Sequence, residues 1–310
     1  MDIEVASIGE MLVEVMREKA DQPLGMPGTF VGPFPSGAPA IFIDAVARLG
    51  VKSGFIGTVG DDEFGELILT RLKNDGVDTS YVRCLKDYTT GVAFVTYFSD
   101  GSRKFIYHLS RAASGKISLN QVNEDYLSKV KYLHIMGSSL SINEDSRKAC
   151  YRAAEIVKDS KGKISLDPNL RPELLSIEEI REICKPILSI CEIVLPSEEE
   201  VKLLTGEEDI EAACDKLLSY GPRIIALKQG KEGSVVITAD QRIEVPSFKV
   251  DEVDPTGAGD CFDAGFIVGL LKGWTLKKVA RFANAVGALS VTKKGPMEGA
   301  PFLNKVNEIL

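Results

Sequence analysis

The sequence contains no CxxC pair and no apolar run long enough to cross a membrane. Its six cysteines are scattered, which argues against a zinc knuckle or a disulfide framework and favours a reducing, cytoplasmic setting. No window approaches the roughly 18 apolar residues of a membrane span. The N-terminal stretch MDIEVASIGEMLVEVMREK carries acidic residues where a signal peptide has a basic start and a long apolar core. We therefore expect a protein that is neither secreted nor membrane-embedded.

Dense basic runs and the common nucleotide-binding fingerprints are also missing. With 45 acidic against 37 basic residues the net charge is −8, which argues against nucleic acid or an anionic membrane as the main partner. Neither GxxxxGK[ST] nor GxGxxG occurs, so a Walker-type loop and a dinucleotide fold are not indicated. Any phosphate that this protein handles must be held by another kind of local site.

The 310 residues contain no linker, low-complexity tract or internal repeat, and 44% of them are hydrophobic, so residues 1–310 are expected to form one domain. Short β-branched runs alternate with longer helical patterns, which predicts a mostly parallel sheet with helices on both faces. The expected strands are 3–9, 53–60, 132–137, 163–167, 193–196, 223–230 and 234–239. Helices are expected at 258–271 and 275–291, with a short one from 301.

Two parts of the chain break this alternation. Residues 11–16 and 28–34 look extended, while residues 91–98 and 103–108 flank SDGS, a turn with an Asp-Gly core. The second pair predicts an antiparallel hairpin, which has no natural place inside a parallel sheet. We expect a small β-sheet lid built from segments at approximately 11–35 and 90–110.

The stretch DPTGAGD, residues 254–260, places glycines and one carboxylate at the start of an apolar helix. Unpaired amides and the helix dipole make such a start an anion site, and small residues let a phosphoryl group approach the backbone. Asp260 is expected to stay ionised there and to accept a proton from an attacking hydroxyl. The alternative is an ordinary glycine-rich turn whose aspartate only favours the dipole.

Six motifs, in this order, resemble the ribokinase-like (PfkB) carbohydrate kinase family, closest to its fructokinase, 2-keto-3-deoxygluconate kinase and tagatose kinase branches. They are SGAPA (36–40), GTVGDDEFG (57–65), DPNLRPELL (167–175), LPSEEE (195–200), KQGKEGS (228–234) and DPTGAGD (254–260). The resemblance implies a three-layer α/β/α sandwich with a mostly parallel central sheet and a small β-sheet lid.

The resemblance also implies roles for the glycine-rich stretch. Asp260 would be the catalytic base, and the backbone of Gly257, Ala258 and Gly259 would stabilise charge on the γ-phosphoryl group of Mg·ATP during its transfer. Glu200 would organise Mg2+. Ser197 stands where the family has Asn and would contact ATP, although Ser197 and Glu200 also form the pattern of a capping box.

The remaining nucleotide contacts implied by the resemblance come from the second half of the chain. They involve Lys228, Gly230, Gly233 and Asn284, together with Gly257 and Gly259. For the first three, the alternative is a hairpin turn with a solvated lysine, and for Asn284 it is an exposed or capped helix position.

For the sugar, the resemblance implies Glu14, Gly37, Tyr107, His108 and Arg171 as contacts beside Asp260. Glu14 replaces the family's Asp. Imidazole at position 108 replaces an arginine found in kinases of sugar acids, and imidazole does not reproduce bidentate guanidinium recognition. These changes favour a neutral ketohexose such as tagatose or fructose, whereas Arg171 keeps a carboxylate or a phosphate open.

Ile41 replaces the Asn of the N-terminal signature, which removes an amide that normally bonds a sugar hydroxyl. Other residues are expected to be structural: Asp62 at a helix start, His134 and Cys261 in the core. Asp167 and Asn169 either orient groups in the cleft or end a strand.

The leading hypothesis is an ATP-dependent sugar kinase that uses Mg2+, with a monovalent cation as an open question. A 2-keto-3-deoxygluconate kinase is the alternative within enzymes. A catalytically silent nucleotide or sugar sensor is the alternative of another class, motivated by Ile41 and Ser197. Exposed β edges and the resemblance favour a homodimer through the lid.

Overall fold

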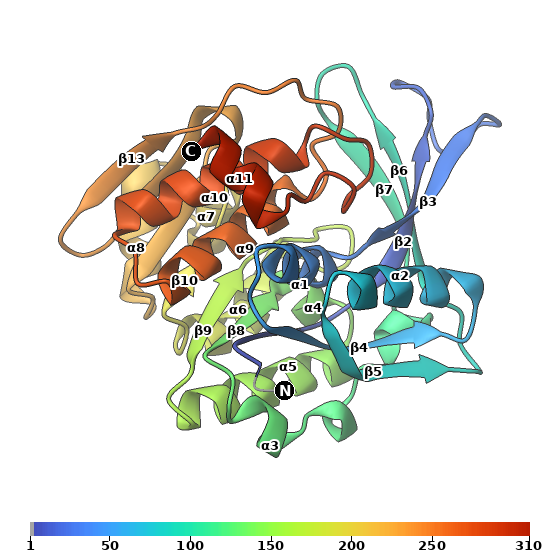
Figure 1. Ribbon diagram of the computed structural model, residues 1–310, viewed down its shortest axis with the longest axis horizontal. Coiled ribbons are helices and arrows are strands. Elements are labelled where there is room, and N and C mark those ends of the chain that lie inside the picture. Colours follow the sequence, from blue (N-terminus) through green and yellow to red (C-terminus); the bar gives the residue numbers. More distant parts are fainter. Residues whose placement is uncertain (1–2) are drawn as a thin grey trace.

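A computed structural model describes residues 3–310 and contains one large sheet with strand order β13-β12-β11-β10-β9-β8-β1-β4-β5 (Figure 1). Neighbouring strands are parallel from β5 to β11, and β12 and β13 continue the sheet antiparallel. The strands are β1 (Val5–Ile8), β4 (Ser53–Gly60), β5 (Asp78–Leu85), β8 (Tyr132–Met136), β9 (Lys163–Asp167), β10 (Ile193–Val194), β11 (Ile224–Lys228), β12 (Gly233–Ile237) and β13 (Arg242–Pro246).

Helices cover both faces of this sheet, which confirms the predicted α/β/α layers (Figure 1). One face carries α1 (Ala38–Arg48), α2 (Glu63–Asn74), α9 (Ala258–Leu271), α10 (Leu276–Ser290) and α11 (Leu303–Ile309). The other carries α3 (Glu124–Leu127), α5 (Glu144–Asp159), α6 (Ile177–Leu188), α7 (Glu198–Thr205) and α8 (Ile210–Ser219), with the short α4 (Gly137–Ser141) after β8.

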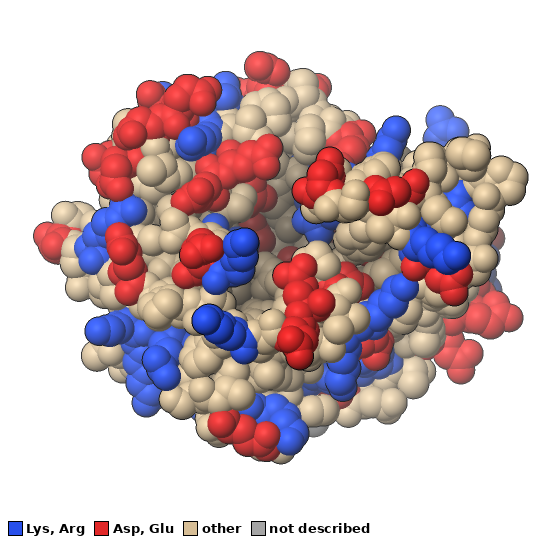
Figure 2. All heavy atoms as spheres, turned by 90° about the horizontal axis from the view of Figure 1, so that it is seen from above, with Lys and Arg blue, Asp and Glu red and all other residues tan. Residues whose placement is uncertain are grey.

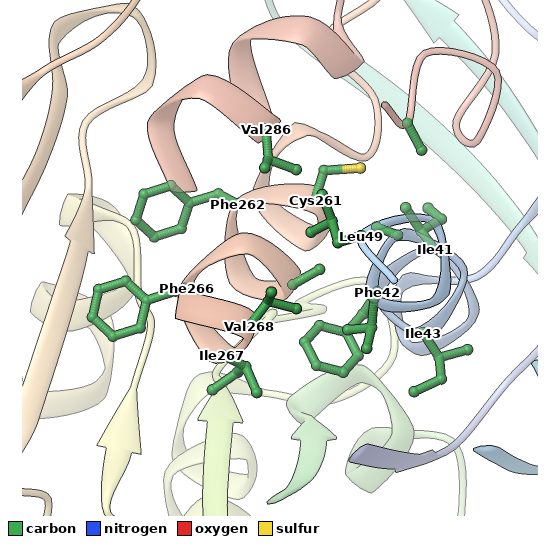
Figure 3. Close-up of a cluster of buried hydrophobic side chains, with 14 of the residues drawn as sticks. Ile41, Phe42, Ile43, Leu49, Cys261, Phe262, Phe266, Ile267, Val268 and Val286 are labelled. Carbon is green, nitrogen blue, oxygen red and sulfur yellow. The ribbon is translucent and has the colours of Figure 1, made fainter. Parts of the chain in front are cut away.

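Alternating side chains of the buried strands supply two hydrophobic cores. Val5 packs into the core with α1 and α9, while its neighbour Ala6 packs into the core with α5, as the two-residue period of a strand requires. Helix α9 is apolar on all sides because α1, α10 and the sheet surround it. Figure 3 shows Val268 of α9 on the side of Phe42 of α1, while Phe262 and Phe266 point to the opposite side of the helix.

Strands β5 and β13 are absent from the sequence-based prediction. Both lie at the edges of the large sheet, where one side of the strand faces solvent and few residues are buried. Their mixed polar composition therefore carries little of the apolar signal by which a buried strand is recognised.

A separate four-stranded sheet with order β3-β2-β6-β7 stands off the large one (Figure 1). Its strands are β2 (Leu12–Arg17), β3 (Phe30–Ser36), β6 (Gly91–Tyr97) and β7 (Arg103–His108). β6 and β7 form the predicted antiparallel hairpin, and β2 pairs parallel with β6. We call this sheet the lid. Among the described residues, no helix is long and apolar enough to cross a membrane.

Candidate active site

A cavity of about 780 Å³ lies between the lid and the carboxyl edge of the large sheet. Parallel strands bring the residues at their carboxyl ends to one edge, where ligands of open α/β sheets bind. The space-filling view shows a hollow near the middle of this side, with side chains of both charges around it (Figure 2). The large layer contributes Glu10, Ser138, Asp167, Arg171, Ser197, Glu200, Lys228 and Asp260, and the lid contributes Leu12, Glu14, Ala93, Arg103, Phe105 and Tyr107.

Gly257 begins the predicted anion site in a conformation that favours glycine. It caps α9 with φ of 81°, in the left-handed region, and a Cβ there would lie 2.4 Å from the Pro296 carbonyl oxygen. Ile41 also leaves no room for a side chain at position 257, since its Cγ2 lies 3.2 Å from where that Cβ would be. Gly257, Gly259 and Asp260 at the start of α9 thus line the cavity with little side chain in front of their backbone, while the Ala258 amide donates to the Pro255 carbonyl oxygen (3.3 Å).

Asp260 lies in this first turn and is buried. Burial raises the pKa of Asp260 to about 7, Asp167 adds to the rise, and Lys228 and Arg171 oppose it. A pKa near 7 leaves Asp260 partly protonated at neutral pH, whereas the sequence predicted a carboxylate that stays ionised, because the loss of hydration outweighs the nearby positive charges. A carboxyl group with a pKa near 7 is well matched to proton transfer at neutral pH.

Lys228, predicted to contact the nucleotide, lines the cavity at the end of β11. Its ammonium group forms ion pairs with two carboxylates. Its Nζ lies 2.9 Å from Asp167 Oδ2 and 3.3 Å from Asp263 Oδ1. Burial acts to lower the pKa of Lys228, but the two aspartates raise it, so the ammonium stays charged. It also sits below the anion site, 3.5 Å from where a Cβ of Gly259 would be.

Ser197 and Glu200 line the cavity and form the capping box that starts α7. Glu200 Oε2 accepts from the Ser197 amide (2.8 Å) and hydroxyl (2.9 Å), and Glu200 Oε1 accepts from the Leu170 amide (3.1 Å). The carboxylate is thus fixed in place, with lone pairs left for further partners.

Two glutamates line the cavity, Glu14 from lid strand β2 and Glu10 from the segment between β1 and β2. Burial raises the pKa of Glu14 to about 8, with Asp254 adding to the rise. Its Oε2 accepts a long bond of 3.3 Å from Ser36, while Oε1 is buried without a partner among the described residues. Glu10, absent from the predicted site, accepts from the hydroxyls of Ser138 and Ser139, both at 2.6 Å. Its position directly after a buried strand was the available signal.

Strand β7 presents Tyr107 to the cavity but places His108 on the opposite face of the lid, exposed and edge-on to Phe94. The predicted pairing of Tyr107 and His108 as sugar contacts is therefore not what the structure shows, since successive side chains of a strand point to opposite faces. The same period puts Phe105 and Arg103 beside Tyr107 in the cavity. Arg103 was missed, although strand alternation counted back from Tyr107 points to it.

Arg171 lies half-buried at the cavity wall, where the prediction of a sugar contact requires it, and Gly37 lines the cavity too. Within residues 3–310 the guanidinium hydrogen-bonds only to the Leu170 carbonyl oxygen (3.0 Å) and forms no ion pair. Burial acts to lower the pKa of Arg171, but the acidic groups of Tyr107 and Asp260 raise it. A charged guanidinium with open donors thus faces the cavity.

Two predicted nucleotide contacts are not brought to the cavity. Asn284 is buried, and its Nδ2 donates to the carbonyl oxygens of Val245 (2.9 Å) and Pro246 (3.2 Å), which ties α10 to β13. Gly233 starts β12 with φ of 115°, where a Cβ would meet the Val245 carbonyl oxygen. Gly230, in the same turn, does line the cavity.

The residues expected to be structural are so. Asp62 caps α2 by accepting from the Gly65 amide at 2.9 Å, and its other oxygen accepts from the Thr90 amide at 2.7 Å. His134 is buried in the core, where burial lowers its pKa to about 3, and Cys261 is fully buried. Asn169, for which the sequence allows a role in the cleft or at a strand end, lines the cavity. Its backbone is left-handed (φ of 39°), and its buried Oδ1 has no partner among the described residues.

Fold and cavity together define a phosphotransferase of the ribokinase-like class: an α/β/α body, a lid, and a buried carboxyl in the first turn of a helix that begins at a glycine on the cavity wall. Residues 2–303 match the pfkB family of carbohydrate kinases. The chain is 36% identical over 306 residues to fructokinase-1 of Oryza sativa subsp. japonica, covering 96% of this chain and 94% of that relative. The chain belongs to the pfkB family, and it is a carbohydrate kinase.

Solved structures agree with this assignment. An E. coli protein described as a ribokinase II, solved with ATP and Mg2+, is 43% identical with a TM-score of 0.92, covering 99% of this chain and 98% of that one. A double-mutant fructokinase of Vibrio cholerae, bound to fructose, ADP and a potassium ion, is 26% identical with a TM-score of 0.88, covering 99% and 98%.

Proposed function

We propose that the protein transfers the γ-phosphoryl group of Mg·ATP to a hydroxyl of a small neutral ketohexose of the fructose or tagatose type. The observation that carries this proposal is Asp260, a buried carboxyl with a pKa of about 7, in the first turn of α9 at the cavity wall. The fructokinase relatives support the choice of sugar.

In this proposal Asp260 accepts the proton of the attacking hydroxyl. The backbone of Gly257, Ala258 and Gly259, with the positive end of α9, stabilises the charge that spreads over the transferred phosphoryl group. The pKa of about 8 keeps Glu14 largely protonated at neutral pH, so that it donates to a sugar oxygen instead of repelling an anion. The lid shields the reacting atoms from water.

The nucleotide phosphates would approach from the side of Ser197, Lys228 and Gly230, which line the same cavity. The residues present fit a magnesium ion, since Asn169 Oδ1 is a buried acceptor without a partner within residues 3–310 and the Glu200 carboxylate is fixed nearby at the cavity wall. Mg2+ keeps several waters and usually takes one or two protein oxygens plus phosphates. Bound there, it would neutralise phosphate charge.

The experiment is a panel assay. The protein is incubated with Mg·ATP and fructose, tagatose, other neutral sugars and sugar acids, ADP formation is measured, and the phosphorylated product is analysed, with K+ and Na+ compared. Phosphorylation of a ketohexose supports the proposal. A folded protein that binds ATP or sugar tightly and releases no ADP with any sugar would be a sensor, and this result would contradict the proposal.

A second candidate acceptor is a sugar acid such as 2-keto-3-deoxygluconate. The favouring observation is the Arg171 guanidinium at the cavity, which forms no ion pair with the described residues, with Arg103 reaching the same space from the lid. Arg171→Gln distinguishes the two: a loss confined to the sugar acid identifies the carboxylate as its partner, whereas equal losses on both sugars place Arg171 at the phosphoryl group.

The outer face of the lid is the proposed homodimer surface. Ile106 is 45% exposed there, next to His108 on the same strand. Size-exclusion chromatography with light scattering on the protein and on Ile106→Glu tests this, since a charge at a buried apolar contact should dissociate the dimer. A monomeric wild-type protein contradicts it.

A further inference from the structure

Tyr97 ends strand β6 of the lid and reaches the loop that leads into the anion site. Its hydroxyl lies 3.2 Å from Asp254 Oδ1 and contacts Thr256 Oγ1. Both partners are buried, and the chain distance exceeds 150 residues, so this is a tertiary contact between lid and body. Burial raises the pKa of Tyr97, and Glu14 and Asp254 add to the rise, so the hydroxyl keeps its proton.

Asp254 connects the Tyr97 hydroxyl to two other segments of the body, at Thr256 and Gly295. Its Oδ1 accepts from the Thr256 amide (3.0 Å) and hydroxyl (2.7 Å), and its Oδ2 accepts from the Gly295 amide (2.9 Å). The Gly295 turn continues into Pro296, whose carbonyl oxygen lies 2.4 Å from where a Cβ of Gly257 would be. One carboxylate therefore fixes both walls of the anion site, and a lid hydroxyl is bound to it.

We propose that Tyr97 is a positioning residue for phosphoryl transfer: its hydroxyl locks the lid onto Asp254 and Thr256, so that lid closure and the orientation of the Gly257 amide are coupled. This rests on the proposed function, because it takes residues 257–260 as the phosphoryl site. The physical reason is that a hydrogen bond in a buried, low-dielectric site is directional and costly to leave unmade. Sugar bound at Glu14, on the neighbouring lid strand β2, would favour the locked arrangement.

The test removes only the hydroxyl, with Tyr97→Phe. A matched control is Tyr126→Phe, which deletes a tyrosine hydroxyl bound to Asp78 Oδ2 (3.4 Å) far from the cavity. Hydrogen exchange by mass spectrometry without ligands is read on peptides covering 252–258 and 293–297. Faster exchange of both peptides in Tyr97→Phe, and no change in Tyr126→Phe, supports the link, whereas unchanged exchange in Tyr97→Phe overturns it.

Turnover supplies the second readout. In Tyr97→Phe the ratio of ATP hydrolysis to sugar phosphorylation should rise about tenfold, as expected for loss of one buried hydrogen bond, with the KM for ATP unchanged. Faster exchange with an unchanged ratio shows a purely structural bond and overturns the positioning role. Thr256→Val combined with Tyr97→Phe should cost less than the sum of the single changes, and full additivity counts against the link. If the wild type phosphorylates no sugar, the proposed function fails, and the exchange result still decides whether Tyr97 holds the loop.

Discussion

Lys228 and Asp263 meet beneath the anion site, with Nζ 3.3 Å from Oδ1, and Asp167 closes the group from the other side. Burial acts to raise the pKa of both carboxyls. It prevails at Asp263, whereas at Asp167 the charge of Lys228 and the hydrogen bonds with Asp263 and Lys228 together lower the pKa. The two carboxyls thus respond differently to the same ammonium group. The Lys228 ammonium also acts to lower the pKa of Asp260, the carboxyl proposed as catalytic base.

Replacing this cation should change both stability and pH dependence. We expect Lys228→Met to lower the free energy of unfolding by about 3–5 kcal/mol, because it leaves buried carboxyls uncompensated. In the wild type, kcat/KM for the sugar should fall as pH drops below about 7, since the base must be unprotonated. The variant loses a charge that lowers the pKa of Asp260, so its midpoint should move to higher pH by on the order of one unit.

Urea unfolding and pH–rate profiles check these two effects. Asp260 faces Asp167, Lys228, Arg171 and Arg103, of which the last three favour its ionised form. The exposed Lys231, three residues along the chain, gives the matched control Lys231→Met, for which neither quantity should change. A midpoint that stays in place in Lys228→Met would show that Lys228 does not influence the base.

Asp260→Asn keeps the size of the side chain and removes its basicity. We expect kcat to fall by about 10² to 10⁴ fold while sugar and ATP still bind, because the amide cannot accept the hydroxyl proton. ADP formation measures the rate, and isothermal calorimetry measures binding. Asp240→Asn, on an exposed turn, is the control. A near-normal rate in Asp260→Asn would remove this residue from the chemistry.

Glu14 should make the protein less stable as pH rises. Its folded pKa of about 8 lies above its ordinary value of 4.5, so the protonated form is favoured by folding. The contribution to stability is present below about pH 4.5 and is lost as pH increases toward 8. At one unit per 1.36 kcal/mol it amounts to at most about 5 kcal/mol.

The neutral isostere Glu14→Gln should therefore unfold at a higher temperature than wild type at pH 8–9, with the difference shrinking toward pH 5. Thermal denaturation across this pH range provides the measurement. The control is Glu208→Gln, at an exposed position. A parallel pH dependence of wild type and Glu14→Gln would mean that Glu14 is ionised throughout.

Arg103 and Lys104 are adjacent on β7 and face opposite sides of the lid, which makes them a matched pair. Arg103→Gln removes a cation from the cavity and should raise a KM, for sugar or for ATP, by about tenfold. Lys104→Gln should leave steady-state kinetics unchanged, since that side chain is exposed on the outer face. Equal effects of the two changes would contradict the side-chain alternation described for this strand.

The sequence alone was enough to predict the α/β/α layers, the hairpin of β6 and β7, and a helix beginning at Ala258 after a glycine turn. These features follow from local physics: the period of apolar residues, the chemistry of Asp-Gly turns, and the freedom of glycine at positive φ. The family motifs add the order of the site residues along the chain. Edge strands such as β5 were not predicted, because they are partly exposed to solvent and their composition lacks the apolar pattern of a buried strand.

Only the tertiary structure decided which of these residues meet. It turned His108 away from the cavity and brought Arg103 in, joined Lys228 to Asp167 and Asp263, used Asn284 to hold β13, and set Tyr97 against Asp254. It also raised the pKa of Asp260 to about 7. Burial and electrostatic interaction depend on distances between residues that are far apart in the chain, and no local pattern contains those distances.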